Sequence, residues 1–220
     1  MTDTILYDYW RSSASFRVRI ALHLKGIPFT SVAVDLLNAE QRDKAHLARN
    51  PQGLVPALAI DGMIMTQSLA ILEYLDAHAP EPPLMPDEKA AAARLRAIAY
   101  AIAMEIHPIC NPSVVAHHAA AFDGDADDKA AWMRHFIDKG LRAVEALAVN
   151  LREHQSRTGN FLHGDTPGLA DCVLVPQLYN ARRWGVDLAA MPCLVDIDAA
   201  CMELPAFRAA APQTVKPADA

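Results

Sequence analysis

A cluster of prolines at residues 80–86 divides this sequence into two parts of different character. Four of these seven residues are proline, and such a segment can neither continue a helix nor lie inside a sheet. Before it, short apolar runs alternate with helical patterns, whereas from Glu88 onward nearly everything suits helices. We therefore predict a first domain over residues 1–80, a linker over 81–87 and an all-helical domain over 88–220.

The first part predicts a small mixed sheet covered by helices, in the order βαβ-α-ββα. A helix that starts near Ser12 and stops at Gly26 joins two strands, which should therefore be parallel with a right-handed crossover. Asp61-Gly62 between two short apolar runs predicts a hairpin. The expected strands are Ile5–Tyr9, Phe29–Asp35, Ala57–Ile60 and Met63–Thr66, and Ser68 is expected to cap a helix over Leu69–Ala79.

The second part is rich in alanine, leucine and charged residues with helical spacing. The final residues, 212–220, are expected to be frayed. The predicted helices are Lys89–Met104, Lys129–Glu153, Leu169–Arg183 and Asp196–Glu203.

Composition narrows the class of protein. Hydrophobic residues make up 52% and the net charge is −6, which favours a packed globular protein and argues against nucleic acid as the main partner. No secretory leader or run of 18 apolar residues is present, and the four cysteines form no C-x-x-C pair, so we expect a cytoplasmic protein with reduced thiols. The adjacent His117 and His118 point apart on a helix, so we expect no metal site.

Arg11-Ser12-Ser13 lies at the predicted turn from strand to helix. The unpaired first-turn amides and the helix dipole stabilise an anion there, including a thiolate, and a serine hydroxyl can donate a hydrogen bond to its sulfur. The alternative is that one of these serines is an ordinary N-cap.

Two more segments of the first part suit a bound peptide. If the Val55-Pro56 bond is cis, the Val55 backbone can pair with an extended peptide; alternatively, Pro56 simply starts an edge strand. Gln67-Ser68 precedes a helix, where free amides and a hydroxyl suit a carboxylate. A thiolate site, a backbone clamp and a carboxylate site together fit a tripeptide thiol.

Residues Ser12–Leu22, with the sequence SSASFRVRIAL, resemble the S-S-C-x-W-R-V-R-I-A-L signature of zeta-class glutathione transferases. The resemblance spans nearly the whole chain in the same order. Further matching segments are Asn50–Pro56, Gln67–Leu75, Gly164–Asp171, Val175–Gln177 and Arg183–Leu188.

The resemblance implies an α/β thioredoxin-like domain followed by an all-α domain, a homodimer, and glutathione as cofactor. It implies isomerisation of maleylacetoacetate or maleylpyruvate to the fumaryl isomer during the breakdown of aromatic compounds. The expected catalytic residues are Ser12, Ser13 and Arg11. The residues Ile106–Asn111 also resemble a stretch of bacterial maleylpyruvate isomerases, in which this histidine and asparagine lie near glutathione and substrate. The residues expected to bind glutathione are Ser12, Gln52, Val55, Pro56, Gln67, Ser68, His107 and Asn111. The residues expected to bind a substrate with two carboxylates are Arg11, His107 and Arg183.

The sequence departs from the family in two places. Ala14 replaces the usual cysteine, so we expect the attacking sulfur to come from glutathione, and Gly168 replaces a frequent capping threonine.

Without the resemblance, Arg182 and Arg183 could be solvated helix charges and His107 an ordinary helix-end histidine. Two other functions remain open, namely a glutathione transferase acting on α-haloacids or other electrophiles, and a non-catalytic binding scaffold.

Overall fold

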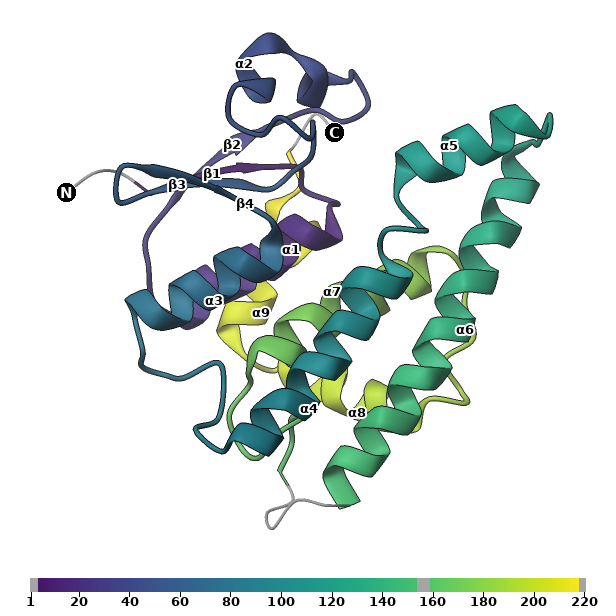
Figure 1. Cartoon of the computed structure of the whole chain (residues 1–220). Coiled ribbons are helices and arrows are strands. Elements are labelled where there is room, and N and C mark those ends of the chain that lie inside the picture. Colours follow the sequence, from purple (N-terminus) through teal and green to yellow (C-terminus); the bar gives the residue numbers. More distant parts are fainter. Residues whose placement is uncertain (1–3, 154–158, 218–220) are drawn as a thin grey trace. The chain divides into compact units, whose positions relative to one another are not determined.

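The computed structural model describes residues 4–153 and 159–217, which form two compact units (Figure 1). The first unit comprises Met1–Leu84 together with the segment that begins at Met202, and the second comprises Met85–Cys201. The C-terminal segment was expected to belong to the helical domain. It joins the first unit because helix α9 (Pro205–Ala210) packs against helix α1 (Ser13–Leu24), where Arg19 Nε donates to the Ala210 carbonyl at 2.9 Å.

The first unit contains a four-stranded sheet in the order β2-β1-β3-β4. Its elements are β1 (Ile5–Asp8), β2 (Thr30–Ala33), β3 (Ala57–Ile60), β4 (Met63–Thr66), the short helices η1 (Glu40–Arg42) and α2 (Lys44–Leu47), and helix α3 (Ser68–His78). The parallel pairing of β1 with β2 and the hairpin of β3 and β4 are confirmed. Asp61 and Gly62 have φ angles of 51° and 76°, as a tight hairpin turn requires.

Helices α1 and α3 lie side by side on one face of the sheet, and α2 lies on the other face (Figure 1). Helix α1 is sandwiched between the sheet, α3 and α9, so every residue from Ser13 to Leu22 is buried. Two of these are arginines, Arg17 and Arg19, at 2% and 1% exposure. No role was predicted from the sequence for either arginine.

The regular elements in the described part of the second unit are all helices, as predicted. Its helices are α4 (Lys89–Tyr100), the π-helical turn η2 (Ala101–Ile106), α5 (Pro112–Ala121), α6 (Ala126–Glu153), α7 (Leu169–Arg183) and α8 (Pro192–Met202). Helix α7 has the predicted bounds, whereas no bounds were predicted for α5, although His117 and His118 were expected to lie on a helix. Gly140 of α6 lets η2 approach closely, because a Cβ there would lie 2.3 Å from Ile106 Cγ1.

Part of the segment that was predicted to be frayed is helical. Pro212–Val215 forms the short helix α10, which packs on α9. Proline at the first position suits a helix start, and residues 218–220 lie outside the described part of the chain. None of the described helices is long and apolar enough to cross a bilayer.

Candidate functional site

The start of helix α1 presents the arrangement that the sequence predicted for an anion. Ser12 is the N-cap, and its Oγ accepts from the Ser15 backbone N–H at 3.2 Å. Because the oxygen is used as the acceptor, the hydroxyl hydrogen is left to donate to another group. The ordinary capping role is therefore present, and it is compatible with a hydrogen bond to a bound sulfur. Ser13 is the first residue of the helix and is buried.

Arg11 is held by aromatic side chains immediately before this helix. Its Nη2 donates to the Tyr9 hydroxyl at 3.0 Å, and its guanidinium carbon lies 4.8 Å from the centre of the Trp10 ring. These contacts orient the guanidinium without neutralising its charge. Arg11 therefore remains a candidate for binding a carboxylate.

The chain's own thiols are poor candidates for the nucleophile. Burial raises the pKa of Cys110 to about 11, and burial also raises the pKa of Cys193 and of Cys201 above the ordinary thiol value. These three thiols stay protonated at neutral pH, and the thiolate is the reactive form. The fourth cysteine, Cys172, is fully buried, and alanine stands at position 14, where the family has a cysteine.

A second helix start lies beside α1. Ser68 was predicted to cap α3, but it is the first helical residue, and Gln67 occupies the cap with a φ of 68°. A positive φ is uncommon outside glycine and occurs preferentially at binding sites. Gln67 Nε2 donates to Gln52 Oε1 at 2.7 Å. Two residues predicted to bind the same ligand, Gln52 and Gln67, are thus brought together from separate segments.

The segment before β3 is fixed by side chains that the sequence did not single out. The Val55–Pro56 bond is cis, as the resemblance implies. The Leu54 carbonyl accepts from Asn50 Nδ2 at 2.8 Å and lies 2.9 Å from Nε2 of His46, which is 2% exposed. Helix α2, which carries His46, therefore holds the backbone that leads into Val55.

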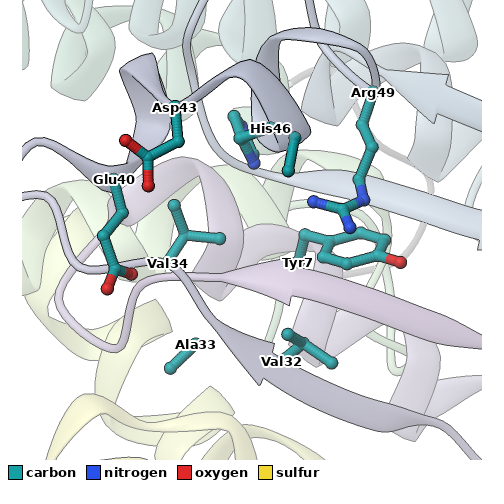
Figure 2. Close-up of a pocket in the computed structure, with 9 residues that line it drawn as sticks. Tyr7, Val32, Ala33, Val34, Glu40, Asp43, His46 and Arg49 are labelled. Atoms are coloured by element: carbon teal, nitrogen blue, oxygen red, sulfur yellow. The ribbon is translucent and has the colours of Figure 1, made fainter.

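A cavity of about 120 Å³ lies between α2 and the first two strands (Figure 2). Its lining includes Val34, Glu40 and Asp43. Tyr7 and Arg49 also line it, and the Arg49 guanidinium carbon lies over the Tyr7 ring, 4.2 Å from the ring centre. None of the predicted site residues lines this cavity. It is therefore separate from the arrangement at the two helix starts.

Arg17 connects the two helix starts. Its Nη1 donates to Ser68 Oγ at 3.2 Å, and it lies one turn after Ser13 on α1, about 6 Å along the helix axis. The Arg17 side chain therefore bridges from the first turns of α1 to the start of α3. Burial lowers the pKa of Arg17 to about 10, so the side chain remains charged at neutral pH.

In the second unit, His107 and Asn111 lie on either side of a short turn. The His107 backbone N–H donates to the Ile102 carbonyl at 2.9 Å and closes η2, a π-helical turn of the kind often found at functional sites. Asn111 caps α5, since its Oδ1 accepts from the Ser113 N–H at 3.0 Å. Trp132 Nε1 of α6 donates to the Ile109 carbonyl at 3.1 Å, which fixes the turn.

The two adjacent arginines at the end of α7 are in different environments. Arg182 forms an ion pair with Asp198 at 2.6 Å, whereas the Arg183 guanidinium carbon lies 5.3 Å from the centre of the Trp184 ring. Arg182 is therefore engaged in the fold of the second unit. Both side chains are exposed, and Arg183 remains the candidate for binding a substrate carboxylate.

The described residues contain no group of three or more histidine, cysteine, aspartate or glutamate side chains that could hold a metal ion. His118 instead packs its ring against Trp132, with 4.1 Å between the ring centres.

Comparison with known proteins defines the class. Residues 2–77 match the family model of the glutathione S-transferase N-terminal domain, and residues 130–212 match that of the C-terminal domain. The chain therefore belongs to the glutathione S-transferase family. The predicted fold, a thioredoxin-like α/β domain followed by an all-α domain, is confirmed.

The relatives narrow the class further. The chain is 54% identical to a maleylacetoacetate isomerase of Rhizobium meliloti over 98% of this chain and 99% of that protein, and 44% identical to a maleylpyruvate isomerase of Ralstonia over 94% and 96%. It matches the holo structure of a bacterial zeta-class maleylpyruvate isomerase with a TM-score of 0.91, at 42% identity over 96% of this chain and 98% of that one. A glutathione-bound maleylacetoacetate isomerase from Anaeromyxobacter dehalogenans matches with a TM-score of 0.85, at 43% identity over 98% of each chain. The resemblance to zeta-class glutathione transferases is confirmed.

Proposed function

We propose that this chain is a glutathione-dependent cis–trans isomerase that converts maleylacetoacetate or maleylpyruvate to the fumaryl isomer. The observation that carries the proposal is the start of α1, where Ser12 Oγ accepts the capping hydrogen bond and keeps its own hydrogen for a sulfur. The high identity to isomerases over nearly the full length supports the choice of substrate class.

The residues present fit glutathione. Position 14 is alanine and carries no sulfur, whereas Ser12 at the start of α1 carries a hydroxyl that can donate a hydrogen bond to the sulfur of a ligand. Ser68 begins α3, which packs beside α1, and it is backed by a buried cation, which suits the γ-glutamyl carboxylate. An extended tripeptide of about 10 Å is proposed to span the two helix starts. Val55 is proposed to pair with the cysteinyl backbone, beside Pro56, Gln52 and Gln67.

The side chains then have distinct tasks in the reaction. Bound glutathione supplies a thiolate that adds reversibly to the conjugated double bond, so that the bond can rotate. Ser12 donates a hydrogen bond to that sulfur, and Ser13 and the first-turn amides of α1 favour its anionic form. Arg11, His107 and Arg183 are proposed to bind the substrate's carboxylates and to stabilise the negative charge that develops on its carbonyl oxygen. His107 and Asn111 are also proposed to lie near glutathione.

The test is a side-by-side assay of maleylacetoacetate, maleylpyruvate and an α-haloacid, each with glutathione supplied and omitted. We expect isomerisation of at least one maleyl substrate that depends on glutathione and exceeds dehalogenation. Negligible isomerisation beside fast dehalogenation would instead support a glutathione transferase acting on haloacids. Retention on immobilised glutathione with no turnover of any substrate would support a binding scaffold.

We further propose that the protein acts as a homodimer in the cytoplasm during the breakdown of aromatic compounds. The family resemblance and the absence of paired cysteines in the sequence support this. Sedimentation of the purified protein at micromolar concentration should give twice the chain mass of 23.9 kDa. Sedimentation as a monomer would contradict the dimer.

A further inference from the structure

We propose that Arg17 is a positioning residue for the γ-glutamyl carboxylate of glutathione, acting through Ser68. It orients the Ser68 hydroxyl toward the ligand and supplies a positive charge that the fold leaves uncompensated. The inference rests on the proposed use of glutathione and goes beyond it by assigning a role to a residue buried behind the binding surface.

Arg17 and Arg19 are both buried in α1, yet their surroundings differ. Arg19 Nη1 forms an ion pair with Asp8 at 2.7 Å, and its other nitrogens donate to the carbonyls of Ala210 and Trp10. Arg17 donates from Nη1 to Ser68, whereas its Nε and Nη2 find no hydrogen-bond partner in the described part of the chain. One buried guanidinium is thus fully satisfied by the fold, and the other is not.

An unpaired buried charge is costly, so its retention calls for a reason outside the folded chain. Burial alone accounts for the lowered pKa of Arg17, and no acidic side chain among the described residues offsets it. An anion at the start of α3 would supply the missing countercharge. Its attraction to Arg17 would be strong, because little water separates buried groups.

The direction of the hydrogen bond to Ser68 adds geometric support. A guanidinium can only donate, so Ser68 Oγ must be the acceptor. The Ser68 hydroxyl hydrogen is therefore free to donate, and the buried position of the side chain limits its directions. Together with the backbone amides of the first turn of α3, this hydroxyl forms a donor set for a carboxylate.

The experiment compares two substitutions of equal chemistry in the full-length protein. Arg17→Met replaces the uncompensated guanidinium by an apolar side chain of similar length, and Arg19→Met does the same at the compensated position. We expect Arg17→Met to keep or raise the thermal midpoint of the free protein, because it removes an unpaired buried charge. Arg19→Met should lower that midpoint by several degrees, because it leaves Asp8 buried without its partner.

Calorimetric binding then tests the role toward the ligand. For Arg17→Met we expect glutathione to bind roughly tenfold more weakly. We expect wild type and Arg17→Met to bind 4-aminobutyryl-cysteinyl-glycine, which lacks the γ-glutamyl α-carboxylate, with equal affinity. The effects of Arg17→Met and Ser68→Ala on glutathione binding should be less than additive, because one residue acts through the other.

The outcomes separate this inference from the proposed function. A wild-type protein that binds no glutathione would overturn both. Wild-type binding with unchanged affinity in Arg17→Met, or an equal loss for glutathione and the analogue, would overturn this inference alone. If Arg17→Met does not fold, Arg17→Gln replaces it, and unfolding of both uncharged variants would overturn the assignment of the charge to ligand binding.

Discussion

Replacement of Ser12 by alanine separates its two roles, because each role has its own measurable cost. The capping bond from the Ser15 N–H to Ser12 Oγ contributes about 1 kcal/mol to the free energy of unfolding. A hydroxyl hydrogen bond to a charged sulfur contributes roughly 1.5–3 kcal/mol, which corresponds to about 10–100-fold in kcat/KM. Ser12→Ala should therefore lose both, as measured by urea unfolding and by isomerase kinetics at saturating glutathione.

The matched control is Ser12→Asn. Asparagine caps a helix as well as serine does, so this variant should keep the wild-type free energy of unfolding while it loses most of the isomerase activity. Ala14→Cys should change turnover far less than Ser12→Ala. The reasoning is refuted if Ser12→Ala loses about 1 kcal/mol of stability while kcat/KM stays within about twofold of wild type.

Three further predictions follow from the structure. Arg183→Ala should raise the KM for the maleyl substrate while the affinity for glutathione stays nearly unchanged. The control Arg182→Ala should mainly lower the thermal midpoint, because Arg182 forms an ion pair within the second unit. Loss of glutathione binding in Arg183→Ala would contradict the assignment of Arg183 to the substrate carboxylate. Burial raises the pKa of Asp171 from 3.8 to about 6, so between these two pH values the folded state retains a proton that the unfolded state releases. As the pH rises from 4 to 6, the free energy of unfolding of the wild type should therefore fall by up to about 3 kcal/mol relative to that of Asp171→Asn, as measured by urea unfolding. Parallel pH profiles of the two proteins would contradict this. His46→Phe removes a part-buried hydrogen bond to the Leu54 carbonyl and should weaken glutathione binding several-fold in calorimetry. Unchanged affinity would show that this bond does not position the backbone before Val55.

Much of the fold was predictable because its signals are local. The Asp61-Gly62 turn dictates the hairpin, and the long apolar periodicity of residues 169–183 dictates α7. The bounds of helix α5 were not predicted, because a ten-residue helix with an asparagine cap and a proline at its first position looks like a loop at its start. The placement of α9 was missed because it depends on the long-range bond from Arg19 to Ala210, which leaves no periodic trace in the sequence.

The candidate site residues also differ in whether local sequence signals or long-range contacts define them. Ser12, Gln52, Gln67 and Ser68 were predicted as site residues from helix starts and from the family motifs, and the structure brings Gln52 and Gln67 into contact. Arg17 was visible within the signature but had no predicted role, because sequence periodicity does not show whether a buried cation has a partner. His46 was missed since its bond to Leu54 spans a turn whose geometry the residue types do not specify.

The proposed function depends on the start of α1 holding the sulfur of bound glutathione as a thiolate. The most direct measurement is the pH titration of the thiol of glutathione bound to the wild-type protein, followed by the ultraviolet absorbance of the thiolate. The account predicts a pKa clearly below that of free glutathione, with much of the shift lost in Ser12→Ala. A bound thiol that titrates at the same pH as free glutathione would contradict it.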